Sequence, residues 1–170
     1  MLKMKFTFDD KTYRHAMNGH ESVLHCHHYM SLTTKLAQDF NDVGGVRILR
    51  ETAEDSIRPL LDSYFSENGV TSPDERLKLG AEYYAVMGMG LMDVTGNDKS
   101  GKVVLKHSHV DEGWIKKWGK RDKPVNFITC GYIAGVFAAV FDRDPRTYLV
   151  GETDSIVTGA DRSKFQVVAR

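Results

Sequence analysis

The sequence lacks several features that define broad classes of protein. Its two cysteines, Cys26 and Cys130, lie far apart, so it carries no disulfide framework. Its 23 basic and 23 acidic residues give a formal net charge of zero. A general nucleic-acid binder needs a basic excess to neutralise phosphates, so that class is disfavoured. No apolar run reaches the length of a membrane span, and the first residues lack the apolar core of a signal peptide. We therefore expect a cytoplasmic protein with no membrane span and no nucleic-acid partner.

The chain has enough apolar residues to build one hydrophobic core. It contains 170 residues, of which 41% are hydrophobic and 10% aromatic. This length suits a single domain, and no internal repeat or long linker divides it. We predict one domain over residues 1–170.

Hydrophobic periodicity and turn residues predict a mixed order of elements. The expected elements are a strand over 2–8, helices over 21–42, 46–68 and 72–86, a hairpin with arms 87–94 and 102–110, a short helical piece carrying Trp114 and Trp118, a helix over 125–141, and strands over 147–153 and 164–168. This order predicts an α+β fold in which an antiparallel sheet packs against a helical layer.

Two of the predicted helices carry distinct apolar patterns. In the helix over 21–42, a broad apolar arc predicts a face that packs into the core; its members are Tyr29, Leu32, Leu36, Phe40 and Val43, and Cys26, Met30 and Ala37 extend it. The helix over 125–141 is apolar on nearly all sides, which predicts burial either centrally or between subunits. Gly131, Gly135 and Ala139 are spaced four apart there, so another backbone could approach closely.

Histidines suggest a metal site. His25 and His28 are three apart on the predicted first helix, and His107 and His109 are two apart on a predicted strand. Each pair would project from one face of its element, and together the four could bind zinc or iron. The alternative is that these histidines are buried and hydrogen-bonded, or simply solvated.

Aromatic and apolar side chains suggest a ligand pocket between the helix over 125–141, the first helix and the hairpin. The alternative for any one of them is plain core. The candidate ligand-binding residues are His25, Cys26, Tyr29, Tyr84, Trp114, Phe127, Cys130, Ala134 and Phe137.

The last quarter of the chain resembles a known family. The segments that carry the resemblance are 130–137 (CGYIAGVF), 148–152 (YLVGE), 159–161 (GAD) and 165–167 (FQV). They resemble the C-terminal half of the 4-vinyl reductase domain family of hydrocarbon-binding proteins. The resemblance implies a small-molecule-binding α+β fold, related to haem nitric-oxide-binding domains, vesicle-tethering subunits and the sensor domains of phenol-responsive activators. It also implies that a homodimer is common.

One departure from that family concerns zinc. Relatives carry zinc-binding cysteines where this chain has Ser155 and Ser163, and only Glu152 of that set remains, with Asp154 and Asp161 nearby. Serine hydroxyls are poor zinc ligands, so the resemblance implies that the family's zinc site is missing. We find no nicotinamide, flavin or iron–sulfur motif, so reductase activity does not follow from the family name.

Three hypotheses follow. The first is a carrier, sensor or accessory protein that holds an apolar or aromatic small molecule, with a tetrapyrrole as one candidate. The second is a metal-dependent enzyme that uses the four histidines, with Cys26 or Glu152 assisting proton transfer. The third is an interaction module in which the apolar helix over 125–141 forms a dimer interface.

Overall fold

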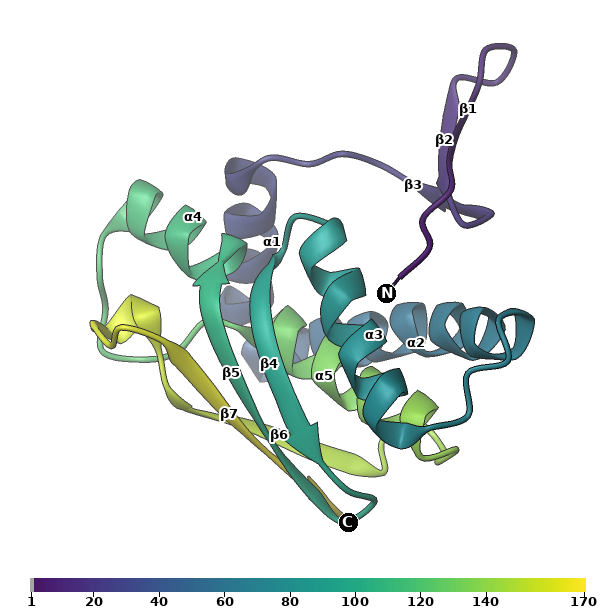
Figure 1. The fold of residues 1–170 in the computed structure, drawn as a ribbon. Helices are drawn as coiled ribbons and strands as arrows, with labels where there is room; N and C mark the ends of the chain where they lie inside the picture. The colour runs from purple at the N-terminus through teal and green to yellow at the C-terminus, as the bar shows by residue number, and fades with distance from the viewer. Residues whose placement is uncertain (1) are drawn as a thin grey trace.

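The computed structural model describes residues 2–170 and contains two antiparallel sheets and five α-helices within that range (Figure 1). The elements in chain order are β1 (Phe6–Asp9), β2 (Arg14–Met17), β3 (His20–Ser22), α1 (His27–Asp39), η1 (Asn41–Val43), α2 (Gly45–Glu67), α3 (Pro73–Val86), β4 (Gly90–Gly96), β5 (Ser100–Ser108), α4 (His109–Trp118), α5 (Phe127–Val140), β6 (Tyr148–Asp154), η2 (Ile156–Thr158) and β7 (Ser163–Ala169). The predicted α+β class with an antiparallel sheet is confirmed.

The main body has three layers: a sheet, a central helix and an outer helix. The four-stranded sheet has the order β4-β5-β7-β6, and each neighbouring pair is antiparallel. Helix α5 lies on one face of this sheet, α2 packs against α5 from the other side, and α3 lies beside β4 (Figure 1). The core therefore sits around α5.

Helix α5 is buried on every side, as its composition predicts. All residues from 129 to 140 are buried. A Cβ on Gly131 would lie 2.0 Å from the carbonyl oxygen of Arg50, and one on Gly135 would lie 2.4 Å from Cγ2 of Ile57. The close backbone approach expected there is thus made by α2 of the same chain. The hypothesis that this helix forms a dimer interface is wrong, because its own chain already covers it.

The N-terminal region differs from the prediction. Residues 6–22 form a separate three-stranded sheet, β1-β2-β3, which stands away from the body (Figure 1). Asn18 and Gly19 both have positive φ, at 50° and 82°, and close a two-residue turn between β2 and β3. This Asn-Gly pair is a strong hairpin signal. Because β3 occupies residues 20–22, the first helix begins at His27 rather than at residue 21.

Helix α1 buries only one margin of the predicted apolar face, at Met30. Its buried residues are Met30, Ser31 and Thr34, which lie toward the elements it contacts, α4 and α2. The predicted core arc points outward instead; its exposed fractions are Tyr29 62%, Leu32 47%, Leu36 47%, Phe40 57% and Val43 68%. The core prediction for this arc is wrong within a single chain.

A second boundary correction affects the histidines. Strand β5 ends at Ser108, whose hydroxyl accepts a hydrogen bond from the backbone N–H of Asp111 at 3.0 Å. Such a cap starts a helix, so His109 belongs to α4 and does not share a strand face with His107. Among residues 2–170, none of the helices is both long and apolar enough to span a membrane.

Candidate functional site

The candidate site is a cavity of about 510 Å³. It lies between the N-terminal sheet, the inner face of α2, the end of α3 and the start of α5. The connection from β3 to α1 contributes Val23, Leu24 and His25 to its wall. Its α2 wall is built by Leu49, Ala53, Ile57 and Leu60, a stripe at helical spacing.

Two polar groups on the cavity wall, the hydroxyls of Tyr84 and Tyr132, are already hydrogen-bonded within the protein. The Tyr84 hydroxyl is hydrogen-bonded to the hydroxyl of Thr129 at 2.8 Å, and the Tyr132 hydroxyl donates to the carbonyl oxygen of Gly80 at 2.7 Å. Both tyrosines therefore offer ring surface to the cavity. Burial raises the pKa of Tyr84 far above its usual range, so this phenol stays neutral. His25 is an imidazole at the same wall.

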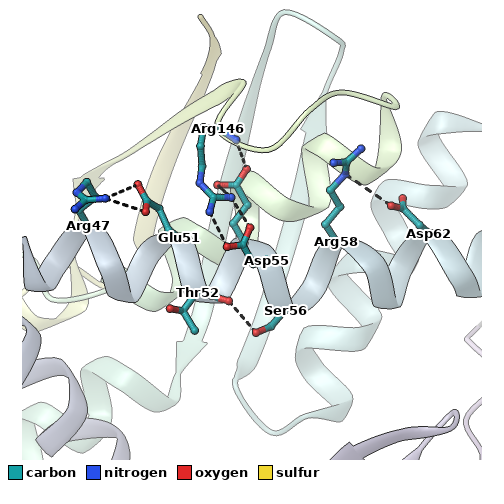
Figure 2. A network of polar contacts seen from close by, with 9 residues as sticks. Arg47, Glu51, Thr52, Asp55, Ser56, Arg58, Asp62 and Arg146 are labelled. Carbon is teal, nitrogen blue, oxygen red and sulfur yellow. Dashed lines mark hydrogen bonds and ion pairs between the residues drawn. The ribbon is translucent and has the colours of Figure 1, made fainter.

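Helix α2 separates its polar and cavity-lining sides. Arg146 bonds Asp55 at 2.6 Å, and its backbone N–H donates to the buried Glu54 at 2.7 Å. Figure 2 shows these groups on one side of α2 and Thr52 and Ser56 on the other. Ser56 donates to the carbonyl oxygen of Thr52 at 2.8 Å, and both residues line the cavity. The ion pairs thus hold α2 in a rotation that presents its apolar side to the hollow.

The structure gathers only part of the predicted ligand-binding set at this cavity. His25 and Tyr84 line it, while Cys26 and Tyr29 border a neighbouring hollow that His25 shares. The remaining five residues lie outside both hollows. Trp114 packs against Trp118 at 4.6 Å between ring centroids, Phe127 is half-buried at the start of α5, and three lie in the core around α5, namely Cys130, Ala134 and Phe137.

The histidines meet in a different combination from the predicted one. The His109 ring lies 4.3 Å from that of His27 and 5.2 Å from that of His25, measured between centroids. Burial, followed by the nearby His27 and His25, lowers the pKa of His109. His107 instead faces Glu112 at 3.8 Å on the surface. The predicted metal set assumed that His25 and His28 share a helix and that His107 and His109 share a strand. In the structure His25 precedes α1, and His109 belongs to α4.

Metal-binding geometry was not found elsewhere in the described chain. Within residues 2–170, no group of three or more His, Cys, Asp or Glu side chains is arranged to hold a metal ion. The predicted zinc or iron centre stays a prediction that metal analysis of the purified protein would test.

Cys26 is an exposed thiol at the N-terminus of α1. Its pKa is lowered because the backbone N–H groups of Tyr29 and His28 stabilise the thiolate. Cys130 is its opposite: burial in the core raises its pKa to about 12. Only the first of the two cysteines is chemically accessible.

A buried polar network joins α4, α5 and the last strands. The Asp111 carboxylate accepts hydrogen bonds from the Asn126 amide at 2.7 Å, from Ser163 at 3.0 Å, and from Ser155 and the Val157 backbone at 3.2 Å. Four donors satisfy this buried charge. Ser155 and Ser163 are the residues at the cysteine positions of the resembled family, and here their hydroxyls donate to a carboxylate. This donor set does not fit zinc, which prefers thiolate and imidazole ligands.

Glu152 is the least satisfied member of this network. Its Oε1 accepts from the Asn126 amide at 2.8 Å, while its buried Oε2 has no partner. Burial raises the pKa of Glu152 to about 7, and the nearby Asp111 adds to that shift while the Asn126 hydrogen bond opposes it. The Asn126 amide separates the two carboxyl groups and bonds both.

The cavity residues that sequence reasoning missed come mainly from α2 and the N-terminal sheet. The α2 residues were not among the candidate pocket residues, and of the N-terminal strands only β1 was predicted in part, by the strand expected over 2–8. Two signals could have found them: the Asn18-Gly19 turn, and an apolar face on α2 too broad for α5 alone to cover.

Comparisons with known proteins identify the fold. No protein-family model and no curated protein sequence matches the chain. Among solved structures, it is similar to the phenol-responsive sensory domain of the transcription activator PoxR with phenol, at a TM-score of 0.78 and 15% identity, over 96% of this chain and 84% of that one.

Two other solved structures are similar. A vinyl-4-reductase family protein from Methanocaldococcus jannaschii matches at a TM-score of 0.53 and 16% identity, over 72% of this chain and 68% of that one. A trafficking protein particle complex subunit 3 from Naegleria fowleri, covalently bound to palmitic acid, matches at a TM-score of 0.47 and 16% identity, over 81% of this chain and 95% of that one. At these identities, the similarity to the PoxR sensory domain and to the vinyl-4-reductase family protein shows a shared α+β fold and nothing finer.

Proposed function

We propose that this protein binds a small molecule with an apolar or aromatic body in the cavity beneath the N-terminal sheet. In this role it is a carrier, a sensor or an accessory protein. The observation that carries the proposal is the cavity itself, about 510 Å³ in volume with walls from four separate parts of the chain. Ligand pockets of drug-sized molecules span roughly 300–1,000 Å³.

The lining favours an apolar ligand with one polar group. Leu49, Ile57 and Leu60 supply aliphatic contacts, and the Tyr84 and Tyr132 rings supply aromatic ones. Because both tyrosine hydroxyls are already bonded, a ligand hydroxyl would instead bond one of the other polar groups of the lining, such as the imidazoles of His15 and His25. The ligand we expect is therefore a phenol-like or larger aromatic alcohol, and a tetrapyrrole remains a candidate that a visible absorption spectrum would reveal.

The similarity to the PoxR sensory domain supports this proposal, because that structure was determined with phenol. The similarity concerns the fold and covers nearly the whole chain. The ligand and the identity of the contact residues in this chain are our own inference from the cavity lining.

A native mass spectrum of the purified protein is the first test. An excess of a few hundred daltons that disappears on denaturation is the expected result. If no excess is found, calorimetric titration with phenol and 2-naphthol follows, and binding of either probe is then expected. Absence of any bound mass together with no binding of both probes would overturn the proposal.

A matched pair of variants locates the site. Ser56→Phe places a ring in the cavity from an exposed position on α2, and Ser66→Phe makes the same change on the same helix away from the cavity. We expect Ser56→Phe to weaken probe binding at least about 10-fold, since lost space and contacts of about 1.4 kcal/mol give that factor. Ser66→Phe should leave binding unchanged. Equal binding by both variants would place the ligand elsewhere.

A further inference from the structure

The N-terminal sheet has one largely apolar side and one charged side. Side chains alternate between the two sides of a strand, and residues paired across antiparallel strands share a side. The register of β1 and β2 therefore places four side chains together, namely Phe6, Phe8, His15 and Met17. The other side carries the charged groups of the sheet, namely Asp9, Arg14 and Glu21. The apolar side is the one turned to the cavity, because Phe6, His15 and Met17 line it.

This apolar side leaves the cavity open. Phe6 lines the cavity and is still 67% exposed, and Val23 and Leu24 line it at 88% and 97% exposure. Phe8 is on the same side of the sheet but is not part of the lining, and it is 54% exposed. A ligand in the cavity would thus meet solvent along this wall. Ligand pockets bury roughly 70–90% of a drug-sized ligand's surface, so the present arrangement is incomplete as a binding site.

The sheet is anchored to the body at one end. Met17 is buried in the core at that end. Next to it, the Asn18 amide donates to the Tyr83 hydroxyl, and the backbone N–H of Lys3 donates to the Tyr64 hydroxyl at 2.8 Å. In the part of the chain that the structure describes, residues 2–22 make hydrogen bonds to the helices only here, at Leu2, Lys3 and Asn18. The hairpin of β1 and β2 projects away from this anchor (Figure 1).

Internal bonds make the sheet a rigid unit. Arg14 and Glu21 form an ion pair at 2.6 Å across β2 and β3. At the hairpin turn, the Asp9 carboxylate accepts the backbone N–H groups of Lys11 and Thr12 at 2.8 and 3.3 Å. The connection to α1, residues 23–26, has no regular structure. A rigid element that is anchored at one end and joined to the body by a short irregular segment can turn as a hinged lid.

We propose that the N-terminal sheet, residues 6–22, is a lid that turns about its Asn18 end and closes over the cavity. Closure brings Phe8 onto the ligand and buries Phe6, Val23 and Leu24. The ligand supplies the contacts that hold the lid closed, because an empty cavity offers these side chains no atoms to pack against. Closure over a ligand rests on the proposed function, whereas the hinge itself does not.

Distances between spin labels test the hinge without a ligand. One label is placed at Lys11→Cys in the hairpin turn and one at Ile48→Cys in the first turn of α2, with Cys26→Ser to remove the exposed native thiol. Ile48→Cys with Leu149→Cys is the control pair, since both positions lie in the body and are about half exposed. We expect electron–electron resonance to give a wider distance distribution for the lid pair than for the control pair. Equally narrow distributions for the two pairs in the free protein would overturn the lid.

Addition of 2-naphthol to the same labelled protein tests closure. We expect the distribution of the lid pair to narrow and shift to shorter distances, while that of the control pair stays unchanged. Binding of 2-naphthol without such a shift would overturn closure. A wide distribution in a protein that binds no 2-naphthol would support the hinge and count against the proposed function, so the two failures are distinguishable.

A truncation of Phe8 tests the contact that closure creates. Phe8 does not line the open cavity, so a fixed sheet would make Phe8→Ala neutral for binding. With a closing lid, Phe8→Ala should weaken 2-naphthol binding about 10-fold, since loss of an aromatic contact of about 1.4 kcal/mol gives that factor. Phe40→Ala is the matched control, because it removes an equally exposed ring outside the cavity lining and should leave binding unchanged. Equal affinity of both variants would contradict closure.

Discussion

Helices α1 and α5 are both rich in apolar residues, yet the chain buries the apolar surface of α5 completely and leaves much of that of α1 exposed. On α5 every residue from 129 to 140 is buried by the sheet, α2 and α3. On α1 and just after it, the main members of the predicted apolar arc remain about half exposed, and the helix buries Met30, Ser31 and Thr34. A helix that is apolar on all sides has no side suited to solvent, so its sequence predicts that it is buried. An amphipathic helix shows which side is apolar, but not whether its own chain covers that side.

The largest expected effect tests how rigidly α5 is enclosed. Gly131→Ala places a Cβ about where the Arg50 carbonyl oxygen lies, at 2.0 Å, and backbone of α2 must move to admit it. We expect a loss of about 3 kcal/mol in the free energy of unfolding, as for strong overpacking of a core. Urea denaturation monitored by circular dichroism measures it.

The matched control is Gly151→Ala on β6, where an added Cβ meets no atom within 4 Å. Its effect should stay within about 0.5 kcal/mol. If the two glycines tolerate alanine equally, the contact between α2 and α5 is looser than described, and the contrast with α1 loses its basis.

An intermediate effect concerns the start of α5, where Asn126 bonds Glu152. The pKa of Glu152 in the folded protein is raised to about 7 from 4.5, so the folded state binds the proton more tightly than the unfolded state. Stability is therefore highest below about pH 4.5 for this group and falls as the pH rises toward 7. A shift of this size corresponds to about 3 kcal/mol, which partial exposure reduces to about 2 kcal/mol.

Denaturation midpoints across this pH window should fall for the wild type and fall less for Glu152→Gln, which keeps the shape but cannot ionise. Other groups contribute equally to both proteins, so the difference between the two curves isolates Glu152. Parallel curves would mean that Glu152 is solvated rather than enclosed with Asn126.

The smallest expected effect is on the stability of a chain altered on the exposed apolar side of α1, at Leu36, which is 47% exposed. In dilute solution, Leu36→Glu should change the free energy of unfolding by less than about 0.5 kcal/mol, like other exposed substitutions. Fluorescence-detected denaturation with serial dilution gives this value. A loss near that of Gly131→Ala at every dilution would show that this side of α1 belongs to the core, which would break the comparison.

Much of the four-stranded sheet and its covering helix could be predicted from the sequence, because their signals are local. The last two strands were expected over 147–153 and 164–168 and lie at Tyr148–Asp154 and Ser163–Ala169. Period-two alternation and turn glycines specify such strands without reference to distant residues. The N-terminal sheet has a local signal of the same kind, the Asn18-Gly19 turn. The helical periodicity of the residues that follow favours a helix from residue 21, so strand β3 was not predicted.

The site could be predicted only in part, because side chains from distant segments of the chain together decide where space is left for a cavity. His25 and Tyr84 were identified as candidates, and both line the cavity. Phe137 was placed in the pocket, yet its ring fills the space between α5 and the sheet next to Gly101 and Tyr148. Side-chain packing of this kind decides which side of α5 is filled and which borders the cavity. Hydrophobic periodicity does not predict such packing.

The two cysteines give this chain a built-in labelling site. Cys26 is exposed and has a lowered pKa, whereas Cys130 is enclosed and its pKa is raised to about 12. A maleimide dye should therefore attach to Cys26 alone in the unaltered protein. Cys26 borders the hollow beside the ligand cavity, at the N-terminal end of α1, so one fluorophore there could report on occupancy of the cavity.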